Sequence, residues 1–153
     1  MISMRNTGGS GGGEIAYSSQ WDDKGHEAET VLREEILPRL GVSVVGREDV
    51  GKPLKEAGVK FAVAKSTYIE DTESGIDYFF YVGDKNTWVG IDFTTSRGTD
   101  GRRKETVNIE GKEVSIDVFG IHIPLYTVQN ARMGAEVDRK AITKKFDWVI
   151  SST

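Results

Sequence analysis

The sequence contains no cysteine and only two histidines among its 153 residues. The lack of cysteine excludes disulfides, zinc–thiolate sites, iron–sulfur clusters and a cysteine nucleophile. With two histidines, a three-histidine metal site would need a second chain. A metal bound by this chain would therefore rest mainly on carboxylates, which are the ligands of hard cations such as Mg²⁺ and Mn²⁺.

Long apolar runs and an excess of positive charge are also missing. No stretch approaches the length of a membrane span, and the N-terminal segment lacks the apolar core of a secretory signal. We therefore expect a cytoplasmic protein that does not contact a membrane. Acidic residues (24) outnumber basic residues (20), which gives a formal net charge of -4. This balance excludes a basic coat that would hold nucleic acid by charge alone.

The composition predicts one domain preceded by a tail. Residues 1–13 are rich in glycine and serine and are predicted to form a flexible tail. The remaining residues, 14–153, have the length and apolar content of a single domain with one core. A glycine-rich phosphate loop would need a preceding buried strand and a following Lys-Ser/Thr, and the tail has neither.

The first predicted element is a helix over about Gly25–Leu40. Gly41 is typical of a helix C-cap, and Pro38 indicates a distorted last turn. Glu29 and Glu35 fall within the apolar arc of this helix, and a carboxylate on a buried face needs a partner. Either both reach water at the edge of the arc, or one of them points into an active site. The arc itself is formed by residues spaced four apart: Ala28, Leu32, Ile36 and Leu40.

The most informative segment is a predicted β-hairpin formed by residues 75–82 and 87–95. Both strands are rich in aromatic and β-branched residues. Gly-Asp-Lys-Asn between them, at 83–86, is a turn sequence. Both faces of the hairpin are largely apolar, which favours a sheet with helices above and below it.

Two aspartates of this hairpin are expected to face each other. If the loop has an even count, Val82 lies opposite Thr87, and counting back along both strands places Asp77 opposite Asp92 on one face. Two like charges so close are unfavourable unless a cation or a shared proton lies between them. An odd count would instead place them on opposite faces, and Asp77 could also lie solvated at the strand end.

The rest of the chain gives coarser predictions. A strand is predicted at residues 59–66, and a polar, basic loop at 96–105. A second hairpin follows and runs to Pro124. The C-terminal part is expected to form a helix over about 136–146 and a short last strand at 146–150.

Three segments together resemble a known superfamily. They are Gly-His-Glu-Ala-Glu at 25–29 on the helix, Gly-Ile-Asp at 75–77 opening a strand, and Val-Gly-Ile-Asp-Phe-Thr-Thr-Ser at 89–96 on the next strand. This arrangement resembles the PD-(D/E)xK nuclease superfamily, which includes restriction endonucleases and Holliday-junction resolvases. The resemblance implies an α/β fold with a restriction-endonuclease-like core, a mixed sheet flanked by helices on both faces. It also implies Mg²⁺- or Mn²⁺-dependent hydrolysis of phosphodiester bonds in nucleic acid, DNA foremost.

The resemblance assigns the metal site residue by residue. The superfamily uses an acidic residue from the first helix, an aspartate at the start of the second core strand and a (D/E)-x-K tripeptide on the third. Carried over to this chain, Glu29, Asp77 and Asp92 are the metal ligands. Thr94 stands where the tripeptide has its lysine, a group that helps to activate the attacking water and to stabilise charge in the transition state.

Two features of the proposed site stay open: which lysine replaces the one missing at Thr94, and which residues hold the nucleic acid. A lysine from elsewhere in the chain would have to replace it, and Lys65 and Lys104 are the candidates. Nucleic acid would be held locally by a basic group just past the third strand, for which the alternative is an ordinary solvated surface. This group consists of Arg97, Arg102, Arg103 and Lys104.

Three functions therefore stay open at the level of sequence. The first is a metal-dependent nuclease. The second is a catalytically inactive module that uses the same scaffold for binding, favoured by Thr94. The third is a small oligomeric structural or assembly protein, in which the hairpin aromatics Phe79, Tyr81 and Trp88 form the contact. A homodimer is compatible with all three functions.

Overall fold

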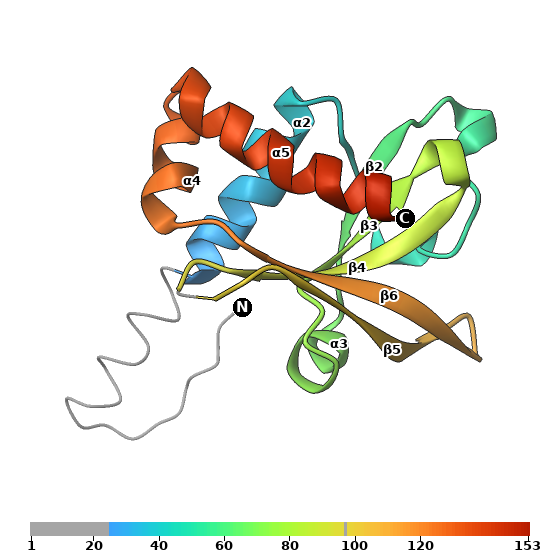
Figure 1. The fold of residues 1–153 in the computed structure, drawn as a ribbon. Helices are drawn as coiled ribbons and strands as arrows, with labels where there is room; N and C mark the ends of the chain where they lie inside the picture. Colours follow the sequence, from blue (N-terminus) through green and yellow to red (C-terminus); the bar gives the residue numbers. More distant parts are fainter. Residues whose placement is uncertain (1–24, 97) are drawn as a thin grey trace, which may run out of the picture.

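The computed structural model describes residues 25–96 and 98–153; the predicted tail at 1–13 and Arg97 lie outside the described residues. A six-stranded mixed sheet with strand order β1-β2-β3-β4-β6-β5 forms the centre of the molecule (Figure 1). This confirms the predicted α/β class. The strands are β1 (Ser43–Val45), β2 (Phe61–Lys65), β3 (Tyr78–Val82), β4 (Thr87–Thr94), β5 (Gly101–Ile109) and β6 (Lys112–His122).

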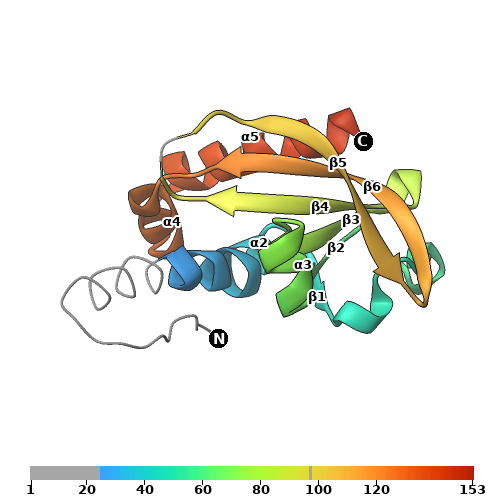
Figure 2. The same ribbon diagram turned by 90° about the horizontal axis from the view of Figure 1, so that it is seen from below.

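The sheet combines antiparallel and parallel pairs. Strands β2, β3 and β4 form an antiparallel meander, while β1 runs parallel to β2 and β6 runs parallel to β4. Strand β5 pairs antiparallel with β6 and is one of the two edge strands, the other being β1 (Figure 2). Because β4 and β6 are parallel, the C-terminal residues of both strands lie at the same end of the sheet.

The first helix follows the predicted pattern. Residues 25–31 are helical and continue through the π-helical segment η1 (Leu32–Ile36) into α2 (Leu37–Arg39). Proline has no N–H and its ring clashes with the carbonyl four residues back, so the wider turn just before Pro38 accommodates it. Gly41 ends the helix with φ of +90°, as a C-cap glycine does.

The C-terminal prediction was partly wrong. Helix α5 (Glu136–Ser152) runs through residues 146–150, where a short strand was expected, and it is preceded by α4 (Leu125–Arg132), which was not predicted. Its buried residues Ile142, Phe146 and Val149 follow helical spacing and pack onto the sheet. The aromatic and β-branched residues of this segment therefore pack from one face of a helix and do not form a strand.

Helices cover both faces of the sheet, but unequally. The first helix, α4 and α5 lie on one face, while α3 (Tyr68–Glu73) lies on the other, below β2 and β3 (Figures 1 and 2). Helix α3 begins with a capping box formed by Thr67 and Glu70. Three short 3-10 turns complete the fold: η2 (Arg47–Asp49), η3 (Lys55–Ala57) and η4 (Gly83–Lys85). None of the helices in the described ranges is long and apolar enough to cross a membrane.

The alternation of the hairpin divides the core into two clusters. Tyr78 and Phe80 face the three larger helices, whereas Phe79, Tyr81 and Trp88 face the other side of the sheet. The last three side chains are buried within this chain. They are therefore not available for the oligomer contact that the sequence suggested, and that detail was wrong.

The register of both hairpins bears on the site. Val82 pairs with Thr87 and Tyr78 with Ile91, which confirms the even loop count. The second hairpin turns at Glu110 and Gly111, both with positive φ. Its first strand, β5, begins at Gly101, so the predicted loop at 96–105 is too long. Three of the basic residues assigned to that loop lie on a strand instead.

Candidate active site

Asp77 lies where the ladder between β3 and β4 breaks. Its N–H donates to the Ile91 carbonyl on β4 (2.8 Å), while its carbonyl accepts from the Ser66 N–H (3.3 Å) and hydroxyl (2.8 Å) just beyond β2. A regular antiparallel residue exchanges both bonds with the same neighbour. The backbone at Asp77 is therefore turned out of the regular ladder, whose last pair is Tyr78–Ile91.

This turn changes where the Asp77 side chain goes. Its Oδ2 accepts a hydrogen bond from the Phe93 N–H at 2.6 Å, so the carboxyl is anchored to the backbone of β4. Asp92, the predicted opposite residue, directs its carboxylate to Arg103. The register prediction is thus confirmed up to Tyr78, but the predicted pairing of Asp77 with Asp92 was wrong: the ladder ends before Asp77, and the two carboxyl groups have different partners.

Asp77 is electrostatically coupled to the first helix. Burial of the carboxyl raises its pKa well above the ordinary value, and the charge of Glu29 raises it further. Asp71 on α3 acts in the same direction, and the hydrogen bond from Phe93 only partly offsets these effects. A carboxyl in this environment favours either a proton or a cation.

Glu29 is the helix carboxylate that points inward. It is 6% exposed, and its Oε1 lies 3.4 Å from Arg33 Nη1 and 3.4 Å from Lys65 Nζ. Arg33 is 5% exposed and also binds Glu34 at 2.8 Å. Glu35 instead forms an ion pair with Arg132 at 2.9 Å. Glu29 is therefore buried rather than solvated at the edge of the apolar arc, and its place in an active site stays a prediction.

A buried hydroxyl lies in the same polar region. Tyr78 is fully buried, and its hydroxyl is the one buried side-chain N or O without a hydrogen-bond partner in residues 25–96 and 98–153. Burial raises its pKa well above the ordinary value, and the charges of Glu29 and Asp77 add to the rise. These two effects keep the phenol protonated.

Asp92 belongs to a separate ion pair. Its Oδ2 accepts from Arg103 Nη1 at 3.0 Å. The same guanidinium donates to Glu105 (2.8 Å) and to the carbonyls of Ser74 (2.8 Å) and Gly75 (3.4 Å). Arg103 therefore connects β5, β4 and the segment that leads into β3.

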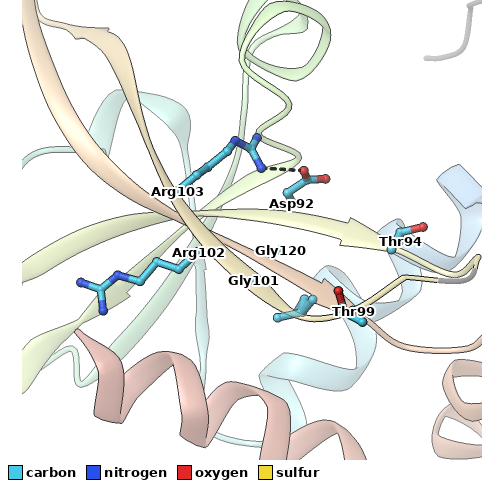
Figure 3. A pocket seen from close by; sticks show the side chains of 8 residues that line it. Asp92, Thr94, Thr99, Gly101, Arg102, Arg103 and Gly120 are labelled. Carbon is cyan, nitrogen blue, oxygen red and sulfur yellow. Dashed lines mark hydrogen bonds and ion pairs between the residues drawn. The ribbon is translucent and has the colours of Figure 1, made fainter.

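Because side chains alternate between the two faces along β5, the residues of the predicted basic group that lie on this strand point to opposite faces of the sheet. Arg102 turns to the α5 side, where it binds Asp117 (3.0 Å) and the Ser152 carbonyl (3.0 Å). Lys104 binds Asp117 as well, at 2.9 Å. Arg103 points to the opposite face, toward Asp92 (Figure 3). These three cations therefore do not form a single cluster.

Thr94 lies beside a hollow at the end of the sheet. The Thr94 Oγ1 and Ser96 Oγ atoms are 2.9 Å apart, and Oγ1 also accepts from the Ser96 N–H at 3.1 Å. The hollow has a volume of ≈ 340 Å³. Ile121 lines it together with the residues labelled in Figure 3, which are Asp92, Thr94, Thr99, Gly101, Arg102, Arg103 and Gly120.

The carboxylates partly meet the needs of a divalent cation. Among residues 25–96 and 98–153, no group of three or more acidic or histidine side chains is placed to hold a metal ion. Mg²⁺ is, however, commonly held by one or two carboxylates, with water and substrate phosphate completing its shell. Glu29 and Asp77 have the oxygen ligands that such a site uses, and Mg²⁺ or Mn²⁺ binding by them stays a prediction.

Some residues of this region were missed by the sequence analysis. Arg33 is four residues after Glu29 on the same helix, a spacing that predicts an ion pair. Asp71 gave no such signal, because only the tertiary fold brings α3 near Asp77. The partly buried Arg47–Glu70 ion pair joins residues 23 apart in sequence and was equally invisible.

The comparisons with known proteins add no further constraint. No protein-family model, no curated protein and no solved structure matches this chain. The assignment of a function therefore rests on the geometry of the chain itself.

Proposed function

We propose that this chain is a metal-dependent nuclease that hydrolyses phosphodiester bonds in nucleic acid, DNA foremost. The observation that carries the proposal is the electrostatic interaction between two acidic side chains from different elements. Glu29 from the first helix raises the pKa of Asp77 at the entry of β3, and Lys65 lies 3.4 Å from Glu29. A helix acid, a strand acid and a lysine at one end of a mixed sheet are the parts that the resemblance implies.

Each residue has a role in this proposal. Asp77 and Glu29 would hold Mg²⁺ or Mn²⁺, and Asp92 would be a further ligand if it were released from Arg103. A bound ion would supply a water of lowered pKa and neutralise charge on the phosphate. The hydrogen bond from the Phe93 N–H holds Oδ2 of the Asp77 carboxyl against the backbone of β4.

Lys65 takes the part of the lysine that is missing at Thr94. Its side chain is 54% exposed while its Nζ lies 3.4 Å from Glu29 Oε1. It therefore has one acidic partner and still faces the solvent from which a substrate arrives. A cation in this place would stabilise negative charge that develops on the phosphate. Lys104 is the weaker candidate, because it is bound to Asp117.

The second candidate function is a catalytically inactive binding module. Two observations favour it: Asp92 is already neutralised by Arg103, and Thr94 cannot supply a charge. Such a module would bind nucleic acid or protein without cleaving a phosphodiester bond. Dimerisation and a cytoplasmic location stay predictions under either function.

A cleavage assay separates the two functions. Supercoiled plasmid and branched DNA are incubated with the full chain and Mg²⁺ or Mn²⁺, and the products are resolved on gels. We expect cleavage by the wild type, loss in Asp77→Asn and in Glu29→Gln, and retention in the control Glu35→Gln, which alters the surface pair with Arg132 on the same helix. Metal-dependent binding without cleavage would favour the module, and cleavage by Asp77→Asn equal to that of the wild type would exclude this active site.

A further inference from the structure

Two glycines face each other on β5 and β6, the two strands at one edge of the sheet, beside Asp92. Gly101 on β5 pairs with Gly120 on β6, and Gly120 pairs with Asp92 on β4. A Cβ atom at Gly101 would meet nothing within 4 Å. A Cβ atom at Gly120 would meet only the carbonyls of Gly101 (3.9 Å) and Asp92 (4.0 Å), which is ordinary van der Waals contact.

Neither glycine is required by the backbone. Glycine is favoured where φ is positive or where another backbone approaches closely. Both glycines are absent from the positions of positive φ, and neither is crowded. In a strand, each glycine lowers stability relative to a residue with a side chain. Their common effect is to leave the floor of the ≈ 340 Å³ hollow without side chains.

Polar side chains line the hollow on two sides of these glycines. Directly paired residues share a face of the sheet, so Asp92 and the two glycines lie in one row. Arg103 follows Gly101 by two residues and lies on the same face, while Arg102 points away (Figure 3). Thr94 and Thr99 line the other side of the hollow.

The lining indicates the chemistry of a ligand. A guanidinium and two hydroxyl groups donate hydrogen bonds to phosphate oxygens. The Asp92 carboxylate would accept from the 2′-hydroxyl of a ribose unit, a group that an internal deoxyribose unit of DNA lacks. Among the described residues that line the hollow there is no aromatic ring on which a base would stack. These groups therefore suit a sugar–phosphate rather than a nucleobase.

We propose that this hollow is a subsite for one sugar–phosphate unit of a nucleic-acid strand. The proposal rests on the proposed nuclease function and deepens it, since it states which part of the substrate lies next to Asp92. The hollow is at the lower end of the size of ligand sites, roughly 300–1,000 Å³. It accommodates a single unit of a strand and is too small for a duplex.

Filling the hollow tests the proposal. Fluorescence anisotropy is measured with a labelled single-stranded oligonucleotide in EDTA, so that no cleavage occurs. Gly120→Val places a side chain on the floor and is expected to weaken binding about tenfold or more. The matched control is Thr106→Val, an exposed position on β5 outside the hollow. Thermal melting is expected to give a Tm for Gly120→Val no lower than that of the wild type, because valine is favoured in strands.

A second variant and two kinds of altered oligonucleotide make the test specific. In Gly101→Ala the new methyl group has open space, and this variant is also expected to weaken binding. It replaces Gly120→Val in the test if that variant fails to fold. Oligonucleotides with abasic sites are expected to bind about as tightly as the intact strand, since the sugar–phosphate is retained. DNA and RNA versions of the same strand show whether a 2′-hydroxyl is accepted.

The outcomes separate this proposal from the nuclease function. Unchanged affinity in Gly120→Val and Gly101→Ala, or a strong loss with abasic strands, overturns the subsite, even if the wild type cleaves DNA. A wild type that binds no oligonucleotide also overturns it. Weakened binding in the filled variants supports the subsite, even if no cleavage occurs and the nuclease function fails.

Discussion

Arg103 Nη1 lies 3.0 Å from Asp92 Oδ2, so an arginine from the edge strand β5 neutralises the acidic residue of the Asp92-Phe93-Thr94 tripeptide. The same guanidinium binds Glu105 and two backbone carbonyls. A divalent cation that used Asp92 as a ligand would therefore compete with Arg103. This competition determines how readily Asp92 takes part in the proposed site.

Removing Arg103 is expected to strengthen cation binding at Asp92. In Arg103→Gln the carboxylate loses its counter-charge, and we expect Mn²⁺ affinity, measured by isothermal titration calorimetry, to rise about tenfold. The variant Arg103→Gln/Asp92→Asn is expected to lose this gain. Arg102→Gln is the control, because Arg102 binds Asp117 on the other face. Equal Mn²⁺ affinity in the wild type and Arg103→Gln would show that the two cations do not share a site.

Asp77→Asn is expected to stabilise the fold at neutral pH. The folded-state pKa of Asp77 is raised, so the folded protein holds this proton more tightly than the unfolded chain. Its contribution to stability is therefore present below the unfolded pKa of about 3.9 and is lost as pH rises through the raised folded value. An asparagine amide oxygen can still accept from the Phe93 N–H, without a buried charge.

Urea denaturation at several pH values measures this effect. At pH 8 we expect the free energy of unfolding of Asp77→Asn to exceed that of the wild type by about 1 kcal/mol, with no difference near pH 3. Asp84→Asn, at an exposed position in η4, is the control for loss of a carboxylate. A destabilised Asp77→Asn at pH 8 would contradict the raised pKa.

Restoring the lysine of the tripeptide is expected to raise cleavage. Thr94 follows Asp92 by two residues on the same side of β4, so Thr94→Lys places an ammonium group next to the hollow. If a cation is limiting there, plasmid cleavage under single-turnover conditions should accelerate about tenfold. Thr95→Lys, one residue further on, is the control for added positive charge. Acceleration in both variants would indicate that only net charge matters.

Lys65→Met is expected to have the opposite effect on the same assay. Removing the ammonium group 3.4 Å from Glu29 should slow cleavage about tenfold or more if Lys65 replaces the missing lysine. Thr94→Lys in the Lys65→Met background should then recover part of the rate. Lys60→Met, which precedes β2, serves as the control. A rate in Lys65→Met equal to that of the wild type would remove Lys65 from the proposed site.

The Arg47–Glu70 pair is expected to control acid stability on the α3 side. Burial alone would raise the pKa of Glu70, but hydrogen bonds from Arg47 and Thr67 outweigh it and hold the pKa below the ordinary value. The stabilisation is therefore present above the unfolded pKa of about 4.3 and is lost as pH falls through the folded value.

Glu70→Gln tests this linkage. At pH 7 we expect the free energy of unfolding to fall by about 2 kcal/mol, because Arg47 loses its charged partner. The difference from the wild type should shrink near pH 3. Glu73→Gln, at an exposed position on the same helix, is the control. A difference that is independent of pH would show that the carboxylate charge does not stabilise this region.

Local patterns predicted much of the fold. Helical spacing predicted the first helix, with Gly41 at its end, and period-two alternation predicted the β3–β4 hairpin with Val82 opposite Thr87. The inward position of Glu29 was also one of the stated alternatives. These features depend on residues close together in sequence, so the chain contains their signal in short windows. At residues 146–150 the local preference for a strand was overridden, because α5 buries Phe146 and Val149 against the sheet.

The sequence by itself determined which side chains are available: it has no cysteine, it predicted a helix ending at Gly41, and it predicted a hairpin whose register depended on an even loop count. Only the tertiary structure decided how the charges are paired. It turned Asp77 out of the ladder toward Glu29, and it placed Arg103 on Asp92. It also aligned Gly101 with Gly120 to leave a hollow. These relationships join strands and helices far apart in the chain, and their geometry follows from packing the whole sheet rather than from any local pattern.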